Sequence, residues 1–431
     1  MKFYNNLKRN KKPICVWGTG YIGLSTLAYY AKNKINALGY DINKNLIDDL
    51  NKGRVKNDDF KKWLGFDIKS LIKKKRLLFT NKIETIKKVN PEVHFICIPT
   101  EKDGKPLTKI LVKTLKSIQK ITSKGLIIIE STLTPGTGDK IVAKMLNKNF
   151  EFIIAPRRDW FVDDSKTLEF MDRVYGCHNK KNNNEINKIL SIVCKKLHKA
   201  TSHRVAEMVK SFENAYRHVD IALANQLSVA YPNDNIREVL KLVGTKWNIG
   251  TFYPGFGSGG YCIPLSSQYV LHGSSFANRL SILKNTIKID KEINLMIAKS
   301  LIKHKIKKVA VLGLSYKANL KVSTLSPIID FCKFMKKNKK VVNLFDPYFN
   351  NEETLKITNC KKISKFPTNL KNYDCVVFAV GHNFFIKNKN KILKNLNCKI
   401  FFDNTGHFAN NKKYLNSKNV KYKLAGSNQW L

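Results

Sequence analysis

The segment that most constrains the fold lies near the beginning of the chain and reads PICVWGTGYIGLSTLAYYAKNKINALGYDIN. Ile14 to Trp17 predict a buried strand, a GxGxxG turn follows, and Tyr21 to Lys32 predict a helix. A second predicted strand, within NALGYDI, then leads to Asp41. GxGxxG by itself is a weak signal, but the order of strand, turn, helix, strand and acidic residue is typical of a dinucleotide-binding βαβ unit.

Four residues of this pattern have an expected role. Gly18 permits the tight turn, Gly20 lets backbone amides approach a pyrophosphate at the helix N-terminus, and Gly23 allows close helix packing. Asp41 would accept hydrogen bonds from the adenosine ribose, and its charge would disfavour a 2′-phosphate. The pattern therefore predicts NAD rather than NADP as the ligand, and the alternative is a turn of purely structural role.

Further apolar runs alternate with helix-like segments after this unit. VHFICIPT (93–100), GLIIIESTLTPGTG (125–138) and FEFIIAP each predict a strand, which indicates a doubly wound parallel sheet. Thr100 and Thr132 follow the C-terminal ends of two of these strands, at the edge where open α/β sheets bind ligands. Taken singly, either threonine could instead be a turn former or a helix cap.

A long helix is predicted from His203 to Tyr231, where apolar residues recur at helical spacing without glycine or proline. Lys210 and Asn214 stand four residues apart and therefore share one face of it, as many solvated surface pairs also do. KKVAVLGLSYKAN, VVNLFDPY, DCVVFAVGHNFF and KIFFDNTG then predict a second Rossmann-like domain without the full glycine pattern. The expected fold is α/β, with two doubly wound domains (1–200 and 301–431) joined by a helical region (201–300).

The net charge of +46 resembles that of a nucleic-acid-binding protein. The lysines are spread along the whole chain, however, so we expect no specific nucleic-acid site and only weak polyanion binding at low salt. No apolar stretch approaches the roughly 18 residues of a membrane span, and MKFYNNLKRNKKP lacks the apolar core of a signal peptide, so a cytoplasmic protein is expected.

The nine cysteines are scattered, without a CxxC pair or a zinc-like histidine spacing, so free thiols and no metal site are expected. Cys15, Cys97 and Cys375 lie within apolar strand-like runs, where a small buried hydrophobe is the simpler interpretation. Cys262 differs, because it follows the glycine-rich backbone of GFGSGGYCIPLSS.

The motifs GTGYIGL, CIPT, ESTLTPGT, EMVKSFENAYR, GGYCIP, LGLSYKAN, FDP and DNTG occur in this order over nearly the whole chain. In this the chain resembles the UDP-glucose/GDP-mannose dehydrogenase family of nucleotide-sugar dehydrogenases. The resemblance implies an NAD-binding domain, a central dimerisation region and a C-terminal domain that closes over the sugar nucleotide. It also implies oxidation of the sugar C6 hydroxymethyl to a carboxylate with two NAD and one cysteine, for polysaccharide or glycoconjugate precursors.

The resemblance also assigns roles to particular residues. Cys262 would capture the aldehyde intermediate as a thiohemiacetal, Lys210 would stabilise charge on the C6 oxygen, and Asn214 would position a water or that oxygen. The NAD contacts would be Gly18, Gly20, Tyr21, Ile22, Gly23, Asp41, Thr100 and Thr132. The sugar nucleotide would lie against Thr251, Phe252, Tyr253, Pro254, Gly255, Gly259 and Lys317, with the glycines letting the sugar rest on the backbone.

Three departures from the family pattern concern the sugar-nucleotide site. Ser266 stands in place of an Asp thought to assist water activation, Arg157 in place of a common Glu, and Thr324 in place of a nucleotide-contacting Arg. Substitutes for the missing acid would be Asp159, Asp163 or Asp164. Two alternatives follow: an oxidation that stops at the aldehyde, and a nucleotide-sugar-binding or polyanion-binding protein that has lost catalysis. The base and the sugar are not specified by the sequence.

Overall fold

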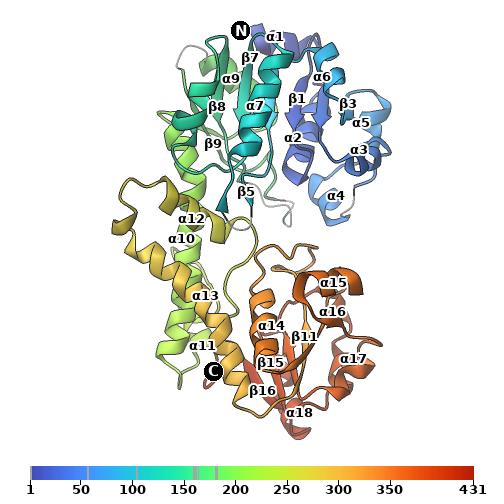
Figure 1. Ribbon diagram of the computed structural model, residues 1–431, viewed down its shortest axis with the longest axis vertical. Helices are drawn as coiled ribbons and strands as arrows, with labels where there is room; N and C mark the ends of the chain where they lie inside the picture. Colours follow the sequence, from blue (N-terminus) through green and yellow to red (C-terminus); the bar gives the residue numbers. More distant parts are fainter. Residues whose placement is uncertain (1, 56–57, 103–104, 159–162, 164, 180–182) are drawn as a thin grey trace. The chain divides into compact units, whose positions relative to one another are not determined.

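The computed structural model describes the 431-residue chain apart from residues 1, 56–57, 103–104, 159–162, 164 and 180–182. The chain forms two compact units, and Figure 1 labels many of their helices and strands. Residues 1–213 and 268–275 form the first unit, and residues 214–267 and 276–431 form the second. No helix in the described part of the chain is long and apolar enough to cross a membrane.

The first unit contains an eight-stranded sheet with the order β10-β9-β8-β7-β4-β1-β2-β3. All neighbours are parallel except β8 and β9, and the strand order reverses beside β1, as in a doubly wound fold. Its strands are β1 (Ile14–Trp17), β2 (Ala37–Tyr40), β3 (Leu77–Thr80), β4 (Val93–Ile96), β7 (Gly125–Ile129), β8 (Phe150–Ile154), β9 (Arg173–Cys177) and β10 (Leu197–Lys199). A separate antiparallel pair joins β5 (Glu101–Lys102) and β6 (Lys105–Pro106).

Both faces of this sheet are buried, which explains why its strands read as continuous apolar runs. Ile14 and Val16 point into one core cluster, whereas Cys15 and Trp17 point into the other. The helices of this unit are α1 (Lys2–Lys8), α2 (Tyr21–Lys32), α3 (Lys44–Asn51), α4 (Asp58–Leu64), α5 (Lys69–Lys73), α6 (Ile83–Val89), α7 (Lys109–Ile121), α8 (Ala143–Met145) and α9 (Asn183–Ser191). The predicted strand, glycine turn and helix at the start of the chain are thus confirmed as β1 and α2.

The predicted long helix is confirmed as α10 (His203–Ala230), which has 28 residues. The boundary between the two units falls within α10, so the expected central region is divided between them. Three further helices belong to this region: α11 (Ile236–Val243), α12 (Ile263–Gly273) and α13 (Ser281–Ile302).

The second unit contains a six-stranded, all-parallel sheet with the order β13-β12-β11-β14-β15-β16. Its strands are β11 (Lys308–Leu312), β12 (Val341–Phe345), β13 (Lys361–Lys362), β14 (Cys375–Phe378), β15 (Ile400–Asp403) and β16 (Lys421–Leu424). Its remaining helices are α14 (Pro327–Lys337), α15 (Asn351–Thr358), α16 (Asn383–Lys387), α17 (Lys389–Lys394) and α18 (Lys412–Ser417). The predicted second Rossmann-like domain is therefore confirmed.

Candidate active site

The glycine turn between β1 and α2 leaves open space at one position. Gly18 has a φ of +90°, and a Cβ there would lie 2.4 Å from the Cys97 carbonyl oxygen. A Cβ on Gly23 would lie 1.8 Å from the Gly18 carbonyl oxygen, because α2 packs directly on the turn. Gly20, by contrast, has no atom within 4 Å of its Cβ position. The turn therefore offers a cradle before the first turn of α2, which fits the pyrophosphate of a dinucleotide.

Asp41 follows β2 directly and is tied to the glycine turn. Its Oδ2 accepts hydrogen bonds from the Thr19 amide at 2.8 Å and the Thr19 hydroxyl at 3.2 Å, and its Oδ1 accepts from the Asn43 amide at 2.9 Å. The side chain is half-buried, and a carboxylate has about four lone-pair sites, so acceptor capacity remains for a ribose. Tyr21 and Ile22 begin α2, directly after the glycine turn in which Thr19 bonds Asp41.

Thr100 and Thr132, predicted separately, are joined in the structure. The Thr100 hydroxyl donates to the Thr132 carbonyl at 2.6 Å. Tyr269, on α12, donates its hydroxyl to the Thr100 carbonyl at 2.7 Å and lies 3.1 Å from the Thr100 Oγ1. The sequence analysis missed Tyr269, because a single tyrosine in a predicted helix carries no signal of its distant partner.

Arg157 does not extend from the end of β8 into solvent but lies 5% exposed beneath α2. Its Nη1 donates to the Thr26 hydroxyl at 2.5 Å and to the Glu130 Oε2 at 3.3 Å, and its Nη2 donates to the Ser25 hydroxyl at 2.8 Å. Arg173 also binds Glu130. Burial alone would raise the pKa of Glu130, but the two guanidinium groups bring it below its ordinary value. Arg157 therefore supports the glycine-turn helix, a role that the sequence comparison at this position did not suggest.

The first turns of α10 hold the loop that follows Thr132. The Glu207 carboxylate accepts hydrogen bonds from the Gly136 amide at 2.6 Å and the Gly138 amide at 2.9 Å. Burial raises the pKa of Glu207 to about 7 against the opposing effect of these two bonds. Lys210 lies nearly one turn further along α10 and is half-buried.

Cys262 is exposed, whereas the other eight cysteines, all of them described, are buried or half-buried. It immediately precedes α12 in the second unit. The Ser266 hydroxyl donates to the Cys262 carbonyl at 2.6 Å and accepts from the Asn214 Nδ2 at 3.0 Å. Asn214 and Ser266 are both buried. The serine that replaces the family's Asp therefore holds the backbone of the cysteine and occupies the amide of Asn214.

The glycines before Cys262 are required by contacts within the second unit itself. Gly257 has a φ of +92°, and a Cβ there would lie 2.7 Å from the Asp290 Oδ1. Cβ atoms on Gly259 and Gly260 would lie 2.7 Å and 2.6 Å from atoms of Tyr316. The expectation that these glycines let a sugar rest on the backbone stays a prediction, and the structure supplies a second reason for them.

The segment 251–255 is anchored to the second unit. The Gly255 amide donates to the Asn225 Oδ1 at 2.8 Å, and Pro254 is buried against Gly426. The Arg237 guanidinium lies over the Tyr253 ring, 4.3 Å from its centroid. Thr251 and Tyr253 are exposed, and Phe252 is half-buried.

Lys317 lies in the loop after β11, which two buried residues hold. The Asp346 Oδ2 accepts from the Leu314 amide at 2.7 Å and lies 3.0 Å from the His382 Nε2. Burial and, less strongly, Arg217 lower the pKa of Lys317 to about 8, whereas Cys262 opposes this shift. The preceding residue, Tyr316, packs against Gly259 and Gly260 of the cysteine segment.

Of the three aspartates named as substitutes for the missing acid, only Asp163 lies within the described residues. Asp163 is paired with Lys166 at 2.9 Å and with Ser165 in a local turn. Asp159 and Asp164 lie outside the described residues. Thr324 accepts a hydrogen bond from the Gly260 amide at 2.9 Å through its carbonyl, so its backbone supports the cysteine segment.

One group of side chains with metal-binding atoms occurs in the first unit, although the sequence predicted no metal site. Ligand atoms of Asp139, His178 and His203 lie within 4.8 Å of one another. The Asp139 carboxylate already bonds the His203 Nε2 at 2.9 Å and the Arg204 Nη1 at 3.1 Å. Because an arginine competes for this carboxylate, we interpret the group as an ion-pair network.

Comparison with known proteins covers most of the chain. Residues 12–194 match the NAD binding domain of the UDP-glucose/GDP-mannose dehydrogenase family, residues 204–294 its central domain, and residues 310–410 its UDP binding domain. UDP-N-acetyl-D-mannosamine dehydrogenase of Methanocaldococcus jannaschii is 32% identical over 330 residues, 73% of this chain and 74% of that protein. UDP-N-acetyl-D-glucosamine 6-dehydrogenase of Salmonella typhi is 28% identical, over 86% of this chain and 90% of that protein.

A solved structure gives the same result for the fold. The UDP-D-ManNAc dehydrogenase of Pyrococcus horikoshii superposes with a TM-score of 0.82 at 25% identity, covering 97% of this chain and 100% of that one. The glycine turn with its open cradle accords with the matched NAD binding domain, and NAD is the cofactor. This chain therefore belongs to the UDP-glucose/GDP-mannose dehydrogenase family of nucleotide-sugar dehydrogenases.

Proposed function

We propose that this protein oxidises the C6 hydroxymethyl of a UDP-linked sugar to a carboxylate in two NAD-dependent oxidations, the second of which uses Cys262. The observation that carries the proposal is the exposed Cys262, whose carbonyl is held by the Ser266 hydroxyl. A primary alcohol cannot become an acid in one hydride transfer, and a reactive aldehyde is best retained covalently. A lone accessible thiol in this segment meets that need.

The cofactor site consists of residues of the first unit. When bound, NAD supplies the acceptor for the hydride that leaves C6 in each oxidation. We assign the pyrophosphate to the cradle at Gly20 and the adenosine ribose to Asp41. Thr100 and Thr132, joined by their hydrogen bond, are assigned to further NAD contacts at the carboxyl edge of the sheet.

The chemical steps balance with one thiol and one water. The C6 alcohol first loses a hydride and a proton, which gives an aldehyde. The Cys262 thiolate then adds to C6, and the resulting thiohemiacetal loses the second hydride and its hydroxyl proton to become a thioester. Water attacks the thioester carbonyl, and breaking the C–S bond releases the carboxylic acid and the thiol.

Two cationic side chains are suited to the charges that develop. We assign Lys210 to the C6 oxygen, where it would stabilise the negative charge that forms when the thiolate or water adds. Lys317 is assigned to the sugar nucleotide, beside the cysteine segment against which its neighbour Tyr316 packs. Asn214, whose amide already bonds Ser266, is assigned to positioning the C6 oxygen or a water together with that hydroxyl.

The proposed substrate class is a UDP-N-acetylhexosamine. The match of residues 310–410 to a UDP binding domain supports the nucleotide, and the names of both relatives above support the N-acetylated sugar. The segment 251–255, Gly259 and Lys317 would contact this ligand. The uronic acid product would serve polysaccharide or glycoconjugate synthesis, in the cytoplasm, where thiols such as Cys262 remain reduced.

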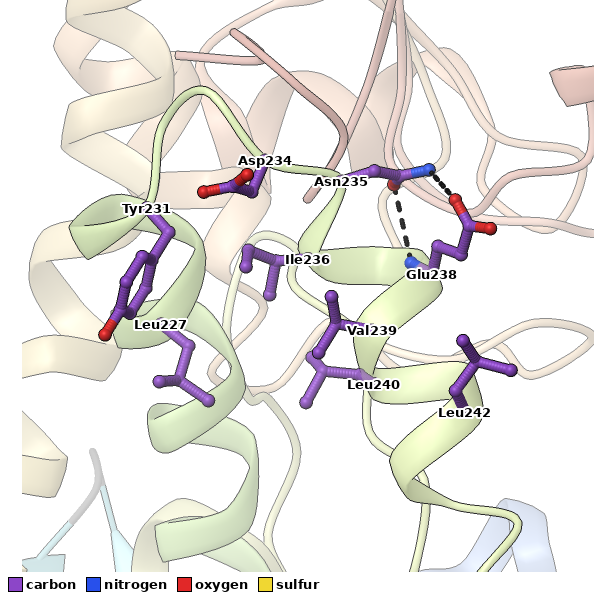
Figure 2. Close-up of a pocket in the computed structure, with 9 residues that line it drawn as sticks. All are labelled: Leu227, Tyr231, Asp234, Asn235, Ile236, Glu238, Val239, Leu240 and Leu242. Atoms are coloured by element: carbon purple, nitrogen blue, oxygen red, sulfur yellow. Dashed lines mark hydrogen bonds between the residues drawn. The ribbon is translucent and has the colours of Figure 1, made fainter.

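We propose that residues 1–200 bind NAD and that residues 301–431 bind the UDP-sugar. We also propose a homodimer formed through the central helices. The central region exposes several large apolar side chains: Tyr216, Leu223, Tyr231, Leu242 and Trp247. A cavity of about 490 Å³ lies between α10 and α11. Figure 2 shows Leu227 of α10 pointing toward Val239 and Leu240 of α11. Exposed apolar side chains on neighbouring helices can mark a protein–protein interface, and light scattering would test the homodimer.

The decisive experiment supplies purified protein with NAD and a set of UDP- and GDP-sugars, measuring NADH and the product mass. A UDP-N-acetylhexosamine should give two NADH per acid. Cys262→Ser should retain the first oxidation and lose the second, because an alkoxide forms less readily than a thiolate. One NADH with free aldehyde would favour the enzyme that stops early, and no turnover with any sugar would favour a binding protein. Acid formation by Cys262→Ser at the wild-type rate would refute the thiol mechanism.

A further inference from the structure

A buried histidine contacts both sides of the cysteine segment. His218 lies on α10, one turn after Asn214, and is 1% exposed. Its Nδ1 lies 2.8 Å from the hydroxyl of Ser267, which is on α12 after Cys262. Its Nε2 lies 3.3 Å from the hydroxyl of Ser258, which precedes Cys262. One imidazole ring therefore reaches the chain on either side of the thiol.

Asp290 of α13 completes this arrangement. Its Oδ1 accepts from the Ser258 amide at 2.7 Å, its Oδ2 accepts from the Ser258 hydroxyl at 2.7 Å, and the same Oδ2 lies 3.3 Å from the His218 Nε2. The Ser258 hydroxyl donates to the carboxylate, so it accepts from the Nε2–H of His218. The Nδ1 of the same ring is paired with the Ser267 hydroxyl. Each polar atom of the group has a partner.

His218 forms a second connection between α10 and the residues that follow Cys262, in addition to the bond between Asn214 and Ser266. Asn214 bonds Ser266, and one turn further along α10, His218 bonds Ser267. Ser258 lies beside Gly257, whose positive φ brings the backbone against Asp290. The segment from Ser258 to Ser267 is thus fastened at both ends, and Cys262 lies between the two attachments.

We propose that His218 is a positioning residue that, with Asp290, clamps Ser258 and Ser267 and so fixes the place of the Cys262 thiol. The inference rests on the proposed function, because it takes Cys262 as the nucleophile. His218 is buried and does not contact the reacting atoms, so it acts only through the loop. The step that requires the thiol should depend on the clamp, and the first hydride transfer should not.

The test compares the two oxidations separately, with a UDP-N-acetylhexosamine for the first and the corresponding 6-aldehyde for the second. His218→Phe keeps a ring of similar size but removes both hydrogen bonds, and His218→Gln restores a donor and an acceptor. With little change in volume, Ser267→Ala removes the contact with His218, and Ser258→Ala removes the hydroxyl contacts with His218 and Asp290 but keeps the amide bond to Asp290. His304→Phe, at a half-buried histidine after α13, serves as the matched control.

We expect His218→Phe to lower kcat of the aldehyde oxidation by about 10²-fold, since a displacement of about 1 Å can cost that much. KM and the alcohol oxidation should change by less than about threefold, His218→Gln should recover part of the loss, and the serine variants should show smaller losses. In a Cys262→Ser background, His218→Phe should cause no further loss, because the two residues act as one unit. Should His218→Phe fold poorly, the serine variants carry the same test.

Equal losses in both oxidations, or an additive loss in the Cys262→Ser background, would overturn the clamp. A different result would refute the proposed function. If Cys262→Ser alone forms acid at the wild-type rate, the thiol is not the nucleophile, whatever the His218 variants do. If Cys262→Ser loses the second oxidation while both His218 variants and both serine variants keep it, only the clamp is wrong.

Discussion

Arg157 offers the sharpest test of what the tertiary structure adds to the sequence. The family pattern places a Glu here, near the sugar, whereas the structure buries Arg157 against Glu130, Ser25 and Thr26 beneath the glycine-turn helix. Removing one partner of a buried ion pair costs about 3–5 kcal/mol. Because Arg173 still neutralises Glu130, we expect Arg157→Met to lose about 3 kcal/mol, at the lower end of that range.

This loss can be measured as a shift in thermal unfolding. In a unit of this size, each kcal/mol changes the unfolding midpoint by about 2–4 °C, so Arg157→Met should lower the midpoint of the first unit by about 6–12 °C. NAD stabilises the state that binds it, so the transition that rises with NAD identifies this unit in calorimetry. Arg157→Glu, which places a second carboxylate beside Glu130, should be less stable still and should bind NAD more weakly.

Arg158 provides the matched control. It pairs with Glu213 at 2.6 Å, but both side chains remain partly exposed, so Arg158→Met should cost no more than about 1 kcal/mol. An Arg157→Met midpoint within about 2 °C of wild type would contradict the buried network. Higher activity in Arg157→Glu would place this residue at the sugar instead.

Asp41→Ala should lose the preference for NAD over NADP in steady-state kinetics, because the carboxylate that repels a 2′-phosphate is gone; an unchanged preference would exclude this role. The pKa of Glu207 is raised to about 7, so the folded state binds the extra proton and the free energy of unfolding should fall as pH rises from about 4.3 to 7. Glu207→Gln should flatten that slope in denaturant titrations, and an identical slope would show that Glu207 is not its source. Gly260→Ala should destabilise the second unit by about 1–3 kcal/mol, since its Cβ would lie 2.6 Å from the Tyr316 ring. Gly65→Ala, at a similar positive φ with no atom within 4 Å, should cost only about 1 kcal/mol, and equal losses would show that the ring contact is unimportant. Binding to DNA or RNA should vanish near physiological salt in filter assays, because the lysines are dispersed; sequence-specific binding that resists salt would contradict this.

The local pattern of apolar residues was enough to predict most central strands of both sheets, and also α2 and α10. A strand buried on both faces must be apolar along its whole length, and a helix repeats its apolar residues at a fixed spacing. Neither edge strand of the second sheet gave such a signal. β13 consists of Lys361 and Lys362, and β16 reads KYKL, because an edge strand needs less apolar surface and often carries lysine. Their place follows from pairing with distant neighbours.

The same distinction applies to the candidate site. GxGxxG, Asp41 and Cys262 could be identified from the sequence, because each chemistry requires a residue type at a short, fixed spacing. Tyr269 and Glu207 were missed, because their partners are distant in sequence and side-chain direction is not encoded locally.

His218 and Asp290 show most clearly what could not be predicted from the sequence. Neither belongs to a motif, and only the packing of α10, α12 and α13 brings them to Ser258 and Ser267 around the cysteine. The sequence by itself thus determined the fold and the cofactor, and it singled out Cys262 as the proposed nucleophile. The tertiary structure decided which buried polar groups hold them in place, because such groups must find partners wherever the chain supplies them.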